Sequence, residues 1–189
     1  MNLGIDIDNV VSDFDGELKK EFLKEDKRKR NTGVINSKLH IVSGQFDWSK
    51  EEVDNFLNAN MERIAQNLKP RRNARKVLEE LHSEGHKIFL ISHRVFPHYK
   101  NPKETTENWL KKWQIPYDKL IFSGKSDKTK ESLENKIDIM LDDRADKCEI
   151  MANNGITCFV MKTKYMKKHK LKTVTSWNNF LKEVENWGK

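Results

Sequence analysis

Acidic side chains follow two apolar runs of this chain, each time as a closely spaced pair. Asp6 and Asp8 end the apolar run of MNLGIDID, and Asp142 and Asp143 end that of KIDIMLDD. Residues two apart in a strand point to the same face, so Asp6 and Asp8 are expected close together at one strand end. Neighbouring carboxylates repel and are costly to bury unless a cation or a reaction requires them. Hard oxygen ligands of this kind suit Mg²⁺, together with water and a substrate phosphate.

Other polar groups follow the remaining apolar runs. Ser92 and Arg94 follow the run KIFLI, while Lys125 and Lys128 come soon after KLIF. Open parallel sheets bind ligands beyond the carboxyl ends of their strands, so these groups are expected near the acids. One carboxylate can attack phosphorus and a second can protonate the leaving group. A metal ion and a lysine can neutralise the transferring phosphoryl group, so the set indicates phosphoryl transfer.

The elements that must position these groups alternate along the chain. Short apolar runs predict strands, and apolar residues at helical spacing predict helices between them. This alternation predicts an α/β fold with a Rossmann-like parallel sheet sandwiched by helices. Strands are expected at 2–8, 87–92, 119–124, 136–143 and 155–161, and helices at 13–30, 49–68, 73–84, 102–115, 146–153 and 176–187.

One stretch departs from the alternation. Residues 12 to 72 separate the first two expected strands and are too long for one crossover. Ser49 and Glu52 form a capping-box pattern that starts a helix inside this stretch. We therefore predict a small helical cap at 13–72, inserted after the first strand of a core that comprises 1–12 and 73–189.

Composition limits the class of protein. The 189 residues suit one core and a small cap, and no apolar run reaches membrane-spanning length. Cys148 and Cys158 are too few for a disulfide framework, and no secretory signal is visible, so a cytoplasmic location is expected. The net charge of +7 would attract anions, or it reflects solvated lysines. The basic run at 162–172 is expected to be a solvated loop, with contact to a phosphate backbone as the alternative.

Four stretches carry a family resemblance. The stretches GIDIDNVVSDF, LISHR, SDKTK and IDIMLDDR resemble, in order, the four motifs of the haloacid dehalogenase superfamily of phosphohydrolases. The long first crossover and the segment WLKKWQIPYDKLIF are similar to the 5'(3')-deoxyribonucleotidase branch and its bacterial nucleotidases. The resemblance spans most of the chain and implies the core and cap architecture described above.

The resemblance also implies catalytic roles. Asp6 would be the nucleophile, forming an aspartyl-phosphate, and would also ligate magnesium. Asp8 would be the general acid, with its backbone carbonyl on the metal. Ser92 would hydrogen-bond the transferring phosphoryl group, and Lys128 would neutralise its charge. Lys125 also fits the third motif, but the Asp-Lys-Thr context favours Lys128.

Further roles concern the metal and the substrate. Asp142 would ligate magnesium, while Asp143 would hold a metal-bound water or position the lysine. Asn9 stands where the family usually has glycine, and asparagine tolerates the backbone angles of such a turn. Arg94 would contact phosphate or a base, or lie in an exposed loop. Phe14 is the best candidate for stacking on a base, with packing inside the cap as the alternative.

The sequence thus predicts a magnesium-dependent phosphomonoesterase that hydrolyses (deoxy)nucleoside monophosphates through an aspartyl-phosphate. A small phosphorylated molecule is the expected partner, rather than nucleic acid or a membrane, and the oligomeric state is left open. Two alternatives remain. One is a phosphatase of another metabolite or of nucleic-acid 3'-phosphate ends, and the other is a phosphate-binding protein without turnover.

Overall fold

A six-stranded parallel sheet forms the centre of the computed structural model, which describes residues 1–187. Its strand order is β3-β2-β1-β4-β5-β6, so the first strand lies in the middle and the chain winds outward on both sides. This confirms the predicted parallel α/β architecture. The strands are β1 (Asn2–Ile5), β2 (Lys87–Ser92), β3 (Lys119–Phe122), β4 (Ile139–Asp142), β5 (Thr157–Met161) and β6 (Lys172–Val174).

Helices cover both faces of this sheet. Alternate residues of β4 enter different apolar clusters, Ile139 and Leu141 in one and Met140 in the other, where it joins Cys148 and Met151. Strands buried on both faces are typical of a parallel sheet in an α/β fold. The helices are α1 (Phe14–Lys29), a short π-helical turn η1 (Ile41–Gln45), α2 (Lys50–Asn67), α3 (Ala74–Ser83), α4 (Pro102–Trp113), α5 (Thr129–Glu134), α6 (Ala145–Asn153) and α7 (Trp177–Glu185).

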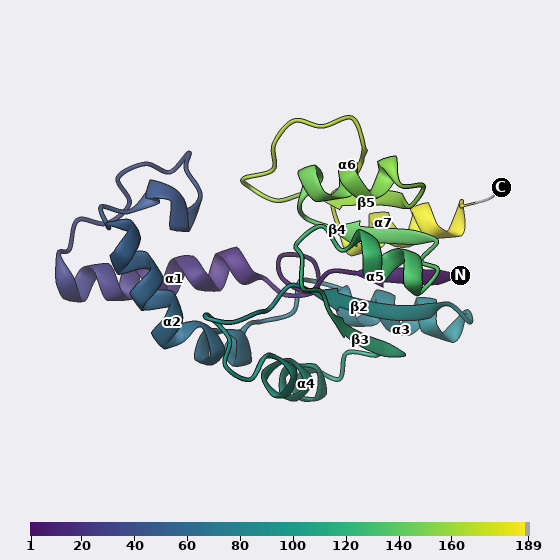
Figure 1. The fold of residues 1–189 in the computed structure, drawn as a ribbon, viewed down its shortest axis with the longest axis horizontal. Helices are drawn as coiled ribbons and strands as arrows, with labels where there is room; N and C mark the ends of the chain where they lie inside the picture. The colour runs from purple at the N-terminus through teal and green to yellow at the C-terminus, as the bar shows by residue number, and fades with distance from the viewer. Residues whose placement is uncertain (188–189) are drawn as a thin grey trace.

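The helices α1 and α2 extend away from the sheet, at the end opposite the N-terminus (Figure 1). They enclose their own aromatic cluster, in which Phe22 stacks on Trp48 and meets Phe56 edge-on. Asp26 supports this cluster, because its carboxylate accepts a hydrogen bond of 3.0 Å from the Trp48 indole nitrogen. The capping box of Ser49 and Glu52 at the start of α2 is present as predicted. The division at 13–72 stays a prediction.

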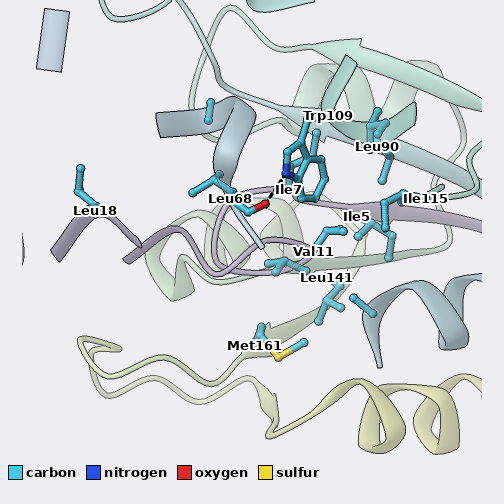
Figure 2. Packing of buried hydrophobic residues seen from close by; sticks show 14 of the residues in the cluster. Ile5, Ile7, Val11, Leu18, Leu68, Leu90, Trp109, Ile115, Leu141 and Met161 are labelled. Carbon is cyan, nitrogen blue, oxygen red and sulfur yellow. Dashed lines mark hydrogen bonds between the residues drawn. The ribbon is translucent and has the colours of Figure 1, made fainter. Parts of the chain in front are cut away.

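Apolar packing continues from the sheet towards these helices. Ile7 and Leu68 belong to one buried cluster that also contains Leu18 of α1 and Ile5 of β1 (Figure 2). Trp109 of α4 lies beside them and donates its indole N–H to the Leu68 carbonyl at 2.8 Å. The segment that returns from α2 to the core is therefore anchored where it reaches the sheet.

Several elements differ from those expected. Strand β1 ends at Ile5 rather than at residue 8, because the Ile7 carbonyl accepts hydrogen bonds from Val11 and Ser12 in a tight turn. The short elements α5 and β6 were not predicted, and β6 occupies the end of the run expected to be a loop. Among residues 1–187, no helix has the length and apolar character needed to cross a membrane.

Candidate active site

Three carboxylates gather at the carboxyl edge of the sheet. Asp6 follows β1, Asp142 ends β4 and Asp143 comes next, and one oxygen from each lies within 4.8 Å of the others. The main-chain N–H of Asp6 donates to the Leu141 carbonyl at 2.9 Å, which fixes the two strand ends against each other. A cluster of carboxylate oxygens of this kind fits Mg²⁺, which prefers hard oxygen ligands.

Lys128 inserts its ammonium group between two of these acids. Its Nζ hydrogen-bonds Asp6 Oδ1 and donates to Asp142 Oδ2 at 2.7 Å, and the residue is only 3% exposed. Burial alone would lower the pKa of Lys128, but Asp142 and Asp6 more than offset this and raise it. The lysine is therefore a fixed positive charge at the acid cluster. The acids open into a hollow of the protein surface that Lys128 lines. Lys125, the other lysine considered for the third motif, is exposed and does not line this hollow.

Burial raises the pKa values of two acids of the cluster. Burial raises the pKa of Asp6 well above its usual range, with Asp142 and Asp143 adding to the effect and Lys128 opposing it. Burial and the neighbouring Asp142 raise the pKa of Asp143 to about 7. A cation among these oxygens would favour their ionised forms, because coordinating groups lose their protons on binding. Perturbed acids of this kind cluster at functional sites.

Asp8 lies in the same hollow but outside the cluster of three acids. Its carboxylate accepts two hydrogen bonds from Arg94 and a third, of 3.2 Å, from the Ser12 hydroxyl. Asp6 and Asp8 lie beyond the end of β1 rather than within it, because the chain turns after Ile7, but both line the same hollow, as expected of acids close together at one strand end. The two acids have different partners, Lys128 for Asp6 and Arg94 for Asp8.

Arg94 is buried, at 1% exposure, so its interpretation as part of an exposed loop was wrong. The guanidinium also donates to Thr106 Oγ1 of α4 at 3.0 Å and lies over the ring of Tyr99. Burial alone would lower the pKa of Arg94, but Asp8 and other neighbours more than offset this and raise it. Sequence reasoning kept exposure open because an arginine after a strand is usually solvated.

Asn9 adopts a left-handed backbone with φ of 64°, which confirms that asparagine supports the turn where glycine was expected. Its side chain joins two further parts of the site. The amide donates to Asp143 Oδ2 at 3.1 Å, and its oxygen accepts the main-chain N–H of Asp15 at 2.9 Å. Asn9 thereby connects Asp143 to the first turn of α1 through hydrogen bonds.

The acids open into a hollow of about 300 Å³, here called the catalytic hollow. Phe14, at the start of α1, is part of its wall and also packs against the buried apolar cluster. Ser92 ends β2 and is buried, but it is not among the lining residues. Several residues that line the hollow were not predicted from the sequence. Arg144 belongs to the fourth motif, whereas the others lie outside the four motifs: Asp15, His40, Met61, Tyr99 and Lys147.

The arrangement of strands and helices is the haloacid dehalogenase-like fold. A hydrolase with this fold from Streptococcus pneumoniae superposes with a TM-score of 0.67 over 97% of both chains, at 11% identity. Another, from Deinococcus radiodurans, was solved with bound phosphate and sodium, and gives a TM-score of 0.68 at 10% identity, covering 95% of this chain and 92% of its own. At such low identity these similarities establish the fold alone.

The family follows from the sequence comparison. The chain belongs to the family described as 5' nucleotidase, deoxy (pyrimidine), cytosolic type C protein, whose model matches residues 1–185. It is 27% identical to a Chlorobaculum tepidum protein named "Putative 5'(3')-deoxyribonucleotidase", over 83% of this chain and 77% of that one. It is 26% identical to a Bacillus cereus "Putative nucleotidase" over 94% of both chains. The protein is accordingly a phosphomonoesterase of the nucleotidase type.

Proposed function

We propose that this protein is a magnesium-dependent nucleotidase that hydrolyses (deoxy)nucleoside monophosphates through an aspartyl-phosphate on Asp6. The observation that carries the proposal is the contact of Lys128 with both Asp6 and Asp142, beside Asp143 at one edge of the sheet. A buried carboxylate next to a fixed cation can receive a phosphoryl group whose charge is already compensated. Membership of the nucleotidase family supports the same chemistry.

The reaction then proceeds in two displacements. An oxygen of Asp6 attacks phosphorus, the bond from phosphorus to the nucleoside oxygen breaks, and Asp8 supplies the proton that this oxygen requires. Water next attacks the phosphorus of the aspartyl-phosphate, gives its proton to Asp8 and releases inorganic phosphate with Asp6 restored. Asp6, Asp142 and the Asp8 carbonyl would hold magnesium, which neutralises phosphate charge when bound.

The remaining groups hold the substrate. Lys128 compensates the charge of the transferring phosphoryl group, and Ser92 remains our candidate for a hydrogen bond to it. Phe14 and Met61 give the catalytic hollow an apolar side on which a base can pack. Asp143 either holds a metal-bound water or positions Lys128. The phosphate bound in the Deinococcus radiodurans hydrolase supports a phosphate site in this fold.

Phosphate release from a panel of substrates tests the proposal. The panel contains ribo- and deoxyribonucleoside 5'- and 3'-monophosphates and several sugar phosphates, each with magnesium and with chelator. We expect release from nucleotides that requires magnesium and falls by at least about 10³-fold in Asp6→Asn. Release from sugar phosphates alone would reject the substrate, and equal rates in Asp6→Asn would reject the nucleophile. A folded protein that is inactive on the whole panel would indicate a phosphate-binding role.

A further inference from the structure

A second and larger hollow, of about 730 Å³, lies beside the catalytic hollow. Three segments form its walls: the start of α1, the linker that leads into α3 and the loop that follows β5. We call it the basic groove. Its cations outnumber its acids, which are Asp13 and Asp15; the cations are Lys19, Lys69, Arg71, Arg72, Lys162 and Lys164.

These six cations are not neutralised by the protein. Within residues 1–187, none of them forms an ion pair with a carboxylate. Other cations of the chain do so, for example Lys20 with Glu17 and Arg63 with Glu21. Uncompensated positive charge in a concave surface concentrates the electrostatic potential there. The basic groove is therefore a place where an anion with several charges would collect.

The walls of the basic groove are held by specific contacts. Arg71 donates to the main-chain carbonyl of Asn9 at 2.6 Å and to that of Lys162 at 3.3 Å. The guanidinium thus bridges the linker, the site turn and the loop after β5 while keeping its charge. Tyr165 fixes the same loop from the other side, because its hydroxyl accepts a hydrogen bond of 2.6 Å from Gln45.

The basic groove continues into the catalytic hollow. Asn9 and Asp15 line both, so the two spaces meet at the turn that follows Asp6. The loop after β5 reaches out on the side where α1 and α2 extend (Figure 1). A ligand in the basic groove could accordingly place one end next to Asp6. Six cations exceed what one additional phosphate needs, so their number favours a ligand with several phosphates.

We propose that the basic groove binds the phosphate backbone of a single-stranded oligonucleotide whose phosphorylated end points into the catalytic hollow. Positively charged grooves that follow the backbone are the general mode of single-strand binding. This site lies beyond the proposed function, because binding at the basic groove needs no turnover. It also gives the excess of basic residues on this edge of the sheet a specific ligand.

Fluorescence anisotropy with a labelled 3'-phosphorylated oligonucleotide tests this site. The titrations are made in chelator, so that no hydrolysis takes place, and at several salt concentrations. The triple variant Lys69→Glu, Arg72→Glu and Lys162→Glu should bind at least about tenfold more weakly. The slope of log K against log salt should become shallower by about 2, since each lost phosphate contact contributes about 0.7 for a single strand.

A matched variant distinguishes the effect of the basic groove on binding from the effect of the net charge of the protein. Lys27→Glu, Lys111→Glu and Lys182→Glu change the same total charge at exposed residues outside the basic groove and outside any ion pair described for the chain. This variant should retain the wild-type affinity within about threefold, because long-range charge is screened by salt. Equal losses in both variants, with melting temperatures showing both folded, would overturn the proposal.

Competitors identify the ligand chemistry. Unlabelled oligonucleotide should displace the probe, while polyglutamate and vesicles containing phosphatidylserine should not do so at matched charge. Equal competition by either of these, or by a nucleoside 3',5'-bisphosphate, would overturn the assignment to an oligonucleotide backbone. Because the measurement involves no hydrolysis, loss of binding leaves the nucleotidase proposal untouched. Failure of the phosphate-release panel likewise leaves the binding result intact.

Discussion

The guanidinium of Arg94 donates two hydrogen bonds to the Asp8 carboxylate, from Nε to Oδ2 at 3.0 Å and from Nη2 to Oδ1 at 2.6 Å. The planar fork of arginine fits a carboxylate in one orientation, which a lysine ammonium cannot reproduce. The guanidinium donates a further hydrogen bond, of 3.0 Å, from Nη1 to the Thr106 hydroxyl on α4. The orientation of Asp8 therefore depends on the segment that follows β2 and on α4, in addition to the Ser12 hydroxyl of its own turn.

Replacing Arg94 tests whether this orientation matters to turnover. Arg94→Lys should lower kcat by about 10- to 100-fold with a smaller change in KM, because a misplaced proton-transfer group slows the chemical step. Steady-state kinetics over a range of pH provide the measurement, since a positioning role should also shift the pH profile. Arg63→Lys, which changes a surface pair with Glu21, is the control. A kcat equal to wild type in folded Arg94→Lys would contradict the role.

Removal of the Lys128 ammonium should cost stability as well as activity. Lys128→Met leaves Asp6 and Asp142 without their buried cation, which we expect to cost about 3 kcal/mol of unfolding free energy at neutral pH. The loss should shrink towards about pH 5, because carboxyls with raised pKa values take up protons in the folded state. Urea unfolding in chelator at the two pH values measures it. Lys130→Met, with its exposed side chain, is the control, and an equal loss at both pH values would contradict the prediction.

Magnesium affinity should rise with pH. Protons compete with the metal at Asp6, whose pKa is raised well above its usual range, and a proton on Asp143, whose pKa is raised to about 7, removes a negative charge beside the metal. Calorimetric titration should show weaker binding at about pH 5.5 than at about pH 8, with proton release at the lower pH. Buffers of different ionisation enthalpy reveal that release. Affinity independent of pH would show that these carboxyls are already ionised without metal.

The Asp26 carboxylate should stabilise the helices α1 and α2. Burial alone would raise the pKa of Asp26, but hydrogen bonds from Gly33, Trp48 and Thr32 more than offset it, and the pKa lies below its usual value. Asp26→Asn should thus cost about 2 kcal/mol at neutral pH. The difference from wild type should shrink as the pH falls below the ordinary pKa range of aspartate, because the carboxyl is then protonated in the folded state too.

Chemical denaturation of Asp26→Asn beside Asp47→Asn separates this role from a general charge effect. Asp47 is an exposed acid of the same region, so its replacement should change the unfolding free energy by less than about 0.5 kcal/mol. Equal effects of the two replacements would indicate that the hydrogen bonds to Asp26 contribute little.

The positions of the acids could be predicted from the sequence better than the contacts that their side chains make. Asp6 and Asp142 could be located because each follows an apolar run that has to be a buried strand. The contact of Arg94 with Asp8 could not be predicted, since it depends on how far the chain turns after Ile7 and on the placement of α4. β6 was missed because Lys172–Val174 is too short and too basic to stand out from the run around it.

The order in which the acids occur along the chain has a consequence for synthesis. Asp6 donates its main-chain N–H to the Leu141 carbonyl, so the first acid of the cluster contacts a residue that is synthesised long after it. A nascent chain released before residue 142 carries Asp6 but neither Asp142 nor Asp143. Truncated products of this kind should consequently lack two of the three carboxylates of the cluster, and we expect them to hold no metal ion there.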